Sequence, residues 1–172
     1  MRDGGRSLRP WLSSRGNRLN GTFDEWHRKD VGRVLVNLFE TAVVQTMGRP
    51  AQTCVTAEFC GKALAIEHDS EVYACDYYVY PAVSLGNIRT THLGEMAFSP
   101  QQQRFGYAKR DSLPEYCGQC RHLKLCWEKC PKNRSVCSPD GQAGLNYYLC
   151  SGIKRFHDHA GPALRQLARQ YA

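Results

Sequence analysis

The sequence lacks a long hydrophobic run, since no segment approaches the roughly 18–20 consecutive apolar residues of a membrane-spanning helix. Residues 1–6 are charged but have no apolar stretch behind them, so they do not resemble a secretory signal peptide. Aromatic residues make up only 10% of the chain, and the mean hydropathy is −0.53. We therefore expect a cytoplasmic protein without a membrane partner, whose small core is helped by something besides apolar burial.

Acidic residues are also in the minority, with 16 Asp and Glu against 23 Lys and Arg and a formal net charge of +7. Such an excess would suit a nucleic-acid partner. The charge falls if cysteines ligate metal, because ligating thiolates are deprotonated. Two metal sites with a net charge of −2 each would leave about +3, which is ordinary. We therefore expect no nucleic-acid partner.

The N-terminal part of the chain predicts one helix behind a disordered leader. Residues 1–21 are rich in Arg, Gly, Ser and Asn and predict the leader. Residues 22–25 (TFDE) fit a helix capping box. Apolar residues at helical spacing behind this box predict an amphipathic helix from about 23 to 46, which Gly48 and Pro50 end.

The rest of the chain predicts short elements. Residues 63–67 and 71–75 are strand-like and flank a turn at 68–70, which predicts a β-hairpin. Ser99 begins a short helix, and its basic run from Arg104 to Arg110 is interpreted as a solvated face, with partner docking as the alternative. Residues 156–171 predict a C-terminal helix. The expected fold class is α+β, small and loop-rich: an N-terminal helix, a short β-hairpin, cysteine-rich cluster-binding loops and a C-terminal helix.

Nine cysteines are the most informative residues of the chain. In a reducing cytoplasm they indicate metal ligands more than disulfides. The densest block is Cys117, Cys120, Cys126 and Cys130, with gaps of two, five and three residues. Structural zinc usually takes two knuckles of similar size, whereas uneven gaps are more typical of iron–sulfur loops. Spacing favours an iron–sulfur cluster and leaves zinc open.

Three stretches of the chain are distinctive: residues 60–68 (CGKALAIEH), 73–79 (YACDYYV) and 85–88 (LGNI). They resemble the C-terminal auxiliary-cluster (SPASM) domain of anaerobic sulfatase-maturating enzymes, which are radical SAM proteins. The block at 117–132 and residues 145–150 (LNYYLC) continue the resemblance, which covers about residues 22–160. On this basis we expect a leader at 1–21, a SPASM-like two-cluster domain at 22–160 and a helical tail at 161–172.

The resemblance implies two [4Fe–4S] clusters, each held by four cysteines. The first set would be Cys54, Cys60, Cys75 and Cys130. The second set would be Cys117, Cys120, Cys126 and Cys150. This crossed use of Cys130 has a parallel in two-cluster ferredoxins. Cys137 is left over and is interpreted as a bystander thiol.

The resemblance also implies a chemistry. In the family, a radical made from S-adenosylmethionine abstracts hydrogen from a sulfatase Cys or Ser, and loss of a further electron and a proton gives formylglycine. Asp76 matches the family position proposed for the base. A carboxylate beside a net-negative cluster takes up a proton more readily. The alternative is that Asp76 caps a turn or accepts backbone hydrogen bonds.

The tyrosines at 73, 77, 78 and 80 surround the loop of the first set. We interpret them as packing over the cluster to limit water. Substrate contact or electron relay is the alternative.

Two departures from the family matter. Ser70 stands where the family has a turn glycine, which a serine can replace. The family's radical SAM barrel with its C-x3-C-x2-C loop is absent from this sequence. We therefore expect a fragment, or a chain that depends on a partner and is inactive alone. S-adenosylmethionine would act only through a missing or separate radical SAM domain.

The expected partners are a sulfatase polypeptide as substrate, the barrel domain, and an electron donor or acceptor such as ferredoxin or flavodoxin. Two other functions remain open at this stage. One is a zinc-binding module for protein interaction or nucleic acid. The other is a simple electron-transfer protein like a two-cluster ferredoxin.

Overall fold

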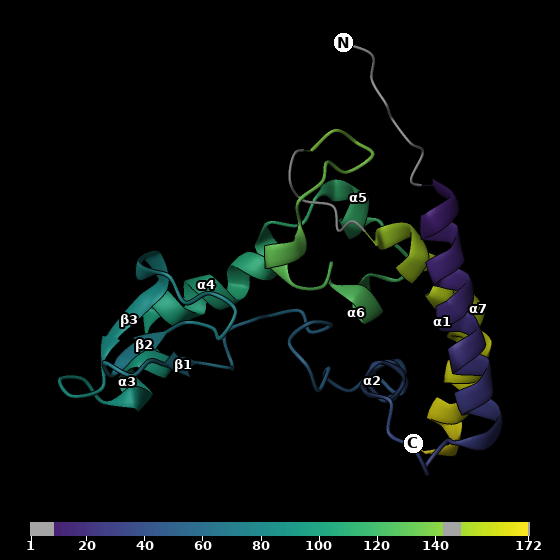
Figure 1. The fold of residues 1–172 in the computed structure, drawn as a ribbon, viewed down its shortest axis with the longest axis horizontal. Coiled ribbons are helices and arrows are strands. Elements are labelled where there is room, and N and C mark those ends of the chain that lie inside the picture. Colours follow the sequence, from purple (N-terminus) through teal and green to yellow (C-terminus); the bar gives the residue numbers. More distant parts are fainter. Residues whose placement is uncertain (1–8, 143–148, 172) are drawn as a thin grey trace. The chain divides into compact units, whose positions relative to one another are not determined.

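The computed structural model describes residues 9–142 and 149–171 (Figure 1). The chain divides into two compact units. Met1–Pro50 and Tyr147–Ala172 form the first, called here the helical unit, and Ala51–Asn146 form the second, called the cysteine unit. This division does not coincide with the boundaries that we expected after residues 21 and 160.

The helical unit contains α1 (Arg9–Lys29), α2 (Asn37–Thr46) and α7 (Cys150–Gln170). Its core is a cluster of rings. Phe23 packs with its ring centroid 5.2 Å from that of Phe39 and 5.6 Å from that of Phe156, in both cases edge to face. Leu164 and Leu167 add aliphatic contacts from α7. Edge-to-face pairs of this kind stabilise a core beyond the area that they bury.

The N-terminal helix differs from its prediction. Helix α1 begins at Arg9, inside the expected leader, because Leu19 already packs against the ring core and extends the helix backwards. Thr22 therefore caps no helix, and its Oγ1 donates to the Arg18 carbonyl within α1. The single helix expected from 23 to 46 is interrupted between Lys29 and Asn37, where Gly32 has a φ of +75° that favours glycine.

The C-terminal helix is present but longer than expected. It starts at Cys150 rather than near residue 156, and Pro162 lies inside it. Its buried face carries Phe156, Ala160 and Leu164, so apolar packing on both sides of the proline holds the helix together. Residues 145–148 of the last motif lie outside the described residues.

The cysteine unit contains a three-stranded antiparallel sheet in the order β1-β2-β3. Its strands are β1 (Ala65–Ile66), β2 (Glu71–Tyr73) and β3 (Ser84–Asn87), and the 3-10 helix η1 (Pro81–Val83) precedes β3. The predicted hairpin is confirmed. Ser70 has a φ of 74° at its turn, which explains why a glycine also suits this position.

Short helices complete the cysteine unit: α3 (Leu93–Ala97), α4 (Pro100–Asp111), α5 (Glu115–Gly118), α6 (Leu123–Cys126) and η2 (Pro131–Asn133). The predicted start of α4 is confirmed, and the Ser99 hydroxyl caps the helix by accepting a hydrogen bond from Gln102 N at 3.1 Å. The α+β class is also confirmed. Among the described residues, no helix combines the length and apolar character needed to cross a membrane.

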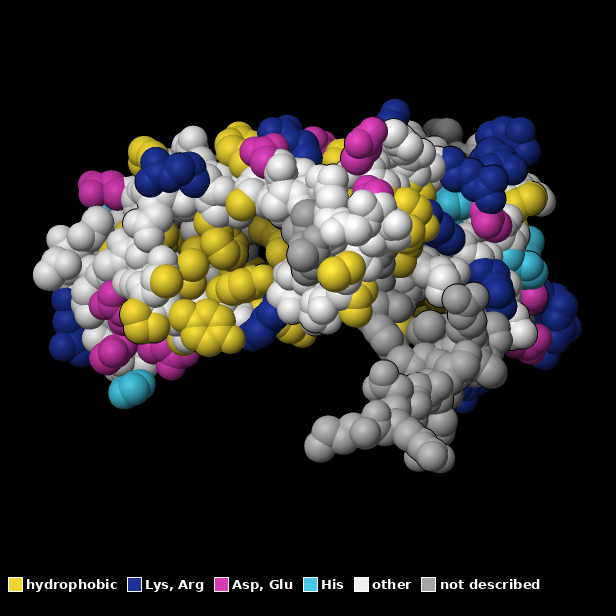
Figure 2. All heavy atoms as spheres, turned by 90° about the horizontal axis from the view of Figure 1, so that it is seen from above, with side chains coloured by type: hydrophobic (Ala, Val, Ile, Leu, Met, Phe, Trp, Pro, Cys, Tyr) yellow, Lys and Arg dark blue, Asp and Glu magenta, His cyan; other side chains and the backbone are white. Residues whose placement is uncertain are grey.

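Hydrophobic side chains gather on the face of the cysteine unit that Figure 2 shows. The exposed large hydrophobic residues of this unit are Val55, Ile66, Tyr77, Val79, Tyr80, Ile88, Leu93, Phe98 and Tyr107. The unit thus leaves much of its apolar surface in solvent, so other contacts must hold its cysteine loops.

Candidate metal centre

The four cysteines of the first set lie in three segments of the cysteine unit. Cys54 and Cys60 belong to the loop before β1, Cys75 follows β2, and Cys130 precedes η2. Cys54 is exposed and the other three are half-buried. All nine cysteines of the chain fall within the described residues and carry free thiols.

The structure brings the first set together. Burial raises the pKa of the Cys60 thiol, and the nearby thiolates of Cys54 and Cys130 act in the same direction. Burial likewise raises the pKa of Cys75 to about 11, with Cys54 again among the contributing charges. Mutual repulsion of this kind requires the thiolates to be near one another. A cationic group bound among them would remove the repulsion.

One face of α4 organises these ligand loops. Gln102, Gly106 and Lys109 are spaced at i, i+4 and i+7 and so share a face of the helix. The buried Gln102 amide donates to the carbonyls of Gly61, at 2.8 Å, and Ala74, at 2.9 Å. It therefore ties the residue after Cys60 to the residue before Cys75.

Gly106 lets the Cys60 loop approach the backbone of α4. Cys60 N donates to the Gly106 carbonyl at 3.1 Å. A Cβ atom at position 106 would stand 2.9 Å from the Cys60 carbonyl oxygen, closer than real contacts allow. The glycine is therefore required for the position of Cys60 on α4.

Lys109 fastens the segment that begins with Cys54. Its side chain is 1% exposed, and its Nζ donates to the carbonyls of Cys54, Val55 and Ala57. Burial lowers the pKa of Lys109 to about 8, whereas the thiolates of Cys60 and Cys54 oppose this shift. Negative charge bound at the first set would therefore keep the ammonium protonated.

The basic run on α4 is thus not a uniform solvated face, and the expectation was wrong for Lys109. Arg110 next to it is exposed and pairs with Glu58 and Asp111. The sequence contained one signal that this face of α4 is buried. Gln102, Gly106 and Lys109 fall on one helix face, and a glycine in that stripe is typical of a close backbone approach.

The second set is divided between the two units. Cys117 lies in α5, Cys120 follows this helix, Cys126 ends α6, and Cys150 is the first residue of α7 in the helical unit. Burial raises the pKa of Cys126, and Cys120 contributes in the same direction. The buried Cys117 thiol donates to the Glu128 carboxylate. The place of Cys150 in this set stays a prediction.

A left-handed turn joins the two sets between Cys126 and Cys130. Trp127, Glu128 and Lys129 have φ angles of 46°, 55° and 57°. Left-handed backbone costs roughly 1–2 kcal/mol per non-glycine residue, and burial of the Glu128 and Lys129 side chains helps to hold it here. In a right-handed helix, residues at i and i+4 would share a face. The left-handed turn frees Cys126 and Cys130 from that constraint, which is compatible with the predicted crossed use of Cys130.

Asp76 is exposed beside the first set. Its backbone N donates to the Ala63 carbonyl at 3.2 Å, and its Oδ1 accepts a hydrogen bond from the Cys75 thiol at 3.3 Å. The carboxylate thus points at a proposed ligand, and the contact seen for it is with sulfur rather than with a backbone amide.

The tyrosines near the first set are of two kinds. Tyr78 is half-buried, and burial raises its pKa to about 12, with the charges of Cys130, Cys60 and Cys75 adding to the shift. Tyr77 and Tyr80 are exposed, and the Lys132 ammonium lies 5.8 Å and 5.2 Å from their ring centroids. Tyr73 is also half-buried, so Tyr73 and Tyr78, unlike Tyr77 and Tyr80, have the burial expected of rings that limit water at the first set.

The donor set fits an iron–sulfur cluster chemically. Cysteine thiolates are its standard ligands. Within residues 9–142 and 149–171, no three His, Cys, Asp or Glu side chains close around a point as the ligands of a single metal ion do. This finding concerns one ion, whereas a cluster is larger and holds its thiolates farther apart.

Residues 54–121 match the family model of SPASM, an iron–sulfur cluster-binding domain. A serine-type anaerobic sulfatase-maturating enzyme of Bacteroides thetaiotaomicron is 41% identical over 147 residues, which are 86% of this chain and 35% of that protein. A cysteine-type enzyme of Clostridium perfringens is 28% identical over 152 residues, or 87% of this chain and 40% of that protein.

Solved structures agree with these relatives. Native anSMEcpe with bound AdoMet and Cp18Cys peptide matches with a TM-score of 0.77 and 26% identity, over 94% of this chain and 44% of that one. The tagged protein with AdoMet matches with a TM-score of 0.76 over 92% and 42%. This chain therefore spans less than half the length of these relatives. It is similar to the SPASM iron–sulfur cluster-binding part of the anaerobic sulfatase-maturating enzymes.

Proposed function

We propose that this chain holds two [4Fe–4S] clusters as the auxiliary domain of an anaerobic sulfatase maturase, where it supports oxidation of a sulfatase Cys or Ser to formylglycine. The observation that carries the proposal is that Cys54, Cys60 and the residue before Cys75 are hydrogen-bonded to α4, with Cys130 near enough to raise the pKa of Cys60. Clusters bound in this way accept electrons at potentials that nearby charge and hydrogen bonds adjust.

The first set would be Cys54, Cys60, Cys75 and Cys130, and the second Cys117, Cys120, Cys126 and Cys150. The raised pKa values of Cys60, Cys75 and Cys126 mean that these thiols give up protons on ligation. The Lys109 ammonium fits the negative charge that the first site would then carry, because it sits among the same thiolates.

Asp76 would take the proton that leaves the substrate thiol or hydroxyl after a hydrogen atom has been abstracted from the adjacent carbon. Its carboxylate accepts from the Cys75 thiol, and ligation of Cys75 removes that thiol proton. The carboxylate then loses its hydrogen-bond donor and can accept a proton from the substrate. Its exposure leaves it accessible to a polypeptide.

The remaining partners follow from the family. We propose a sulfatase polypeptide as substrate, in keeping with the Cp18Cys peptide bound to the similar protein anSMEcpe. S-adenosylmethionine would act through a radical SAM domain, present in a longer chain or supplied separately. A ferredoxin or flavodoxin would exchange electrons with the clusters.

The test combines the reconstituted chain, within the complete maturase or with a radical SAM partner, with S-adenosylmethionine and a sulfatase peptide. Asp76→Asn should keep both clusters while formylglycine formation, followed by mass spectrometry, falls by on the order of 10²–10⁴. Asp111→Asn is the matched control, because Asp111 is an exposed carboxylate paired with Arg110 on α4.

Normal turnover by Asp76→Asn would contradict the role of Asp76, and so would loss of its clusters. If no cognate partner yields formylglycine although both clusters are present, the chain is an electron-transfer protein and not a maturase domain. A colourless protein that holds zinc after anaerobic reconstitution would contradict the proposal altogether.

A further inference from the structure

Arg134 is a buried cation, and one of its guanidinium nitrogens has no hydrogen-bond partner in the part of the chain that the structure describes. The residue follows η2 and is 7% exposed. Its Nη1 donates to the Ser112 hydroxyl at 3.0 Å, and its Nη2 donates to the Trp127 carbonyl at 3.3 Å. Its Nε–H is buried and has no hydrogen-bond partner among the described residues.

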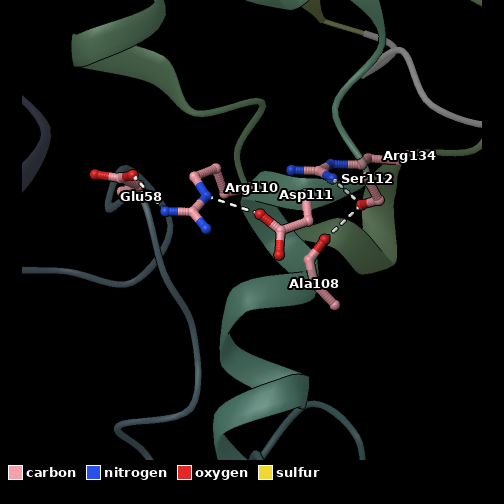
Figure 3. Close-up of polar contacts among 6 residues, drawn as sticks. All are labelled: Glu58, Ala108, Arg110, Asp111, Ser112 and Arg134. Atoms are coloured by element: carbon pink, nitrogen blue, oxygen red, sulfur yellow. Dashed lines mark hydrogen bonds and ion pairs between the residues drawn. The ribbon is translucent and has the colours of Figure 1, made fainter.

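The guanidinium is held in a fixed place. Figure 3 shows the chain of contacts: Arg134 donates to Ser112, and the Ser112 hydroxyl donates to the Ala108 carbonyl at 2.6 Å. Ser112 directly follows α4, the helix that carries the loops of the first set. The bond to Trp127 fixes the other side of the guanidinium to the left-handed turn.

Cysteines of both proposed ligand sets act on this cation when they are ionised. Burial lowers the pKa of Arg134, and the charges of Glu128, Cys117 and Cys60 oppose that shift in this order. Cys60 belongs to the first set and Cys117 to the second. Arg134 is therefore within electrostatic range of both sets.

A buried guanidinium remains charged and is costly unless negative charge compensates it. A buried N–H without an acceptor adds a further energetic cost. Sulfur atoms of a net-negative cluster would compensate the positive charge and would also accept a hydrogen bond from the buried N–H.

On the basis of the proposed ligand sets, we propose that Arg134 is a positioning residue shared by the two clusters. Its fixed positive charge raises the reduction potentials of both, and its Nε–H donates to a cluster sulfur. The sign follows from Coulomb's law, because an added electron is stabilised by a positive charge nearby. One side chain thus sets two potentials in the same direction.

The experiment is a redox titration of the reconstituted protein, monitored by EPR, with iron content measured alongside. Arg134→Gln should retain both clusters and shift both midpoint potentials to more negative values than in the parent protein. The matched control is Arg110→Gln, which removes the same charge from a side chain that is 43% exposed and paired with Glu58 and Asp111 (Figure 3). Its potentials should not move, because solvent screens that charge.

The outcomes separate this inference from the proposed function. If both clusters are present in Arg134→Gln and either potential is unchanged, the shared role is wrong while the ligand sets stand. If the parent protein shows no pair of [4Fe–4S] clusters, the proposed function fails, and this inference fails with it.

A second variant tests the proposal if Arg134→Gln loses its clusters. Arg134→Lys keeps the positive charge, so it should retain the iron and hold both potentials closer to the parent values. Loss of iron from Arg134→Lys as well would show that the shape of the guanidinium matters and not its charge, and it would overturn the proposal.

Discussion

The helical unit buries rings, whereas the cysteine unit buries polar side chains. Phe23, Phe39 and Phe156 meet edge to face or stacked in the first. The buried polar residues of the second are Thr56, Gln102, Lys109, Glu128, Lys129, Arg134 and Ser138. Its buried apolar residues are few, with Val72, Ala74, Met96 and Cys117 among the described ones.

This difference shows where each unit obtains its stability. Apolar burial stabilises the helical unit without help from any ligand. In the cysteine unit, Lys109 and Arg134 place positive charge inside the protein next to thiols. Buried cations of this kind favour a folded state in which the thiols are ionised and bound to metal. The cysteine unit should therefore depend on its clusters, and the helical unit should not.

Removal of iron should give the largest effect. A chelator applied under reducing conditions leaves the Lys109 and Arg134 charges without bound negative partners, so the cysteine unit should open. Hydrogen exchange followed by mass spectrometry should then show amides of α4 and the 54–60 loop losing protection, while those of α1 and the C-terminal half of α7 keep theirs. Equal loss of protection in both units would contradict the claim that only the cysteine unit depends on its clusters.

Phe156→Ala should give the reverse result. Phe156 is fully buried and contacts the rings of Phe23 and Phe39, so its truncation should cost about 3–5 kcal/mol in the helical unit. Exchange in α1 and α7 should accelerate while the first cluster stays bound. Phe98→Ala is the control, because Phe98 is 79% exposed and should leave both units unchanged.

Gly106→Ala should have a smaller and more local effect. The added methyl group would meet the Cys60 carbonyl at 2.9 Å, and overpacking of this kind costs about 1–3 kcal/mol. The first cluster should be lost more readily on gel filtration, as iron analysis would show. Gly118→Ala, between Cys117 and Cys120, has open space around its Cβ and should lose no iron. Equal iron retention by both variants would contradict the role of α4 in holding the ligands of the first cluster.

The sequence predicted those elements whose signals are local. The hairpin was found because strand-like runs flank a turn at 68–70, and the start of α4 because Ser99 and Pro100 mark a helix cap. The start of α1 could not be found in this way, because the residues before Thr22 are mostly polar and become helical through packing of Leu19 against distant rings.

The sequence identified the cysteines of the candidate site, but it did not show how they are arranged in space or which residues hold their loops. Spacing alone left zinc open, and the ligand sets came from the family resemblance. The roles of Gln102, Lys109 and Arg134 depend on loops far away in the chain, such as the Lys109 contacts with residues 54–57. A charged residue in a basic stretch is usually solvated, so its burial here becomes visible only in the fold.

The most direct test of the account is the crossed use of Cys130. Mössbauer spectroscopy of ⁵⁷Fe-reconstituted Cys130→Ala should show loss of one cluster and the same remaining spectrum as Cys54→Ala, with Cys120→Ala giving the complementary spectrum. Cys137→Ala should keep both clusters, because Cys137 is exposed and outside both sets. Retention of both clusters in Cys130→Ala, or a spectrum that matches Cys120→Ala, would contradict the two ligand sets.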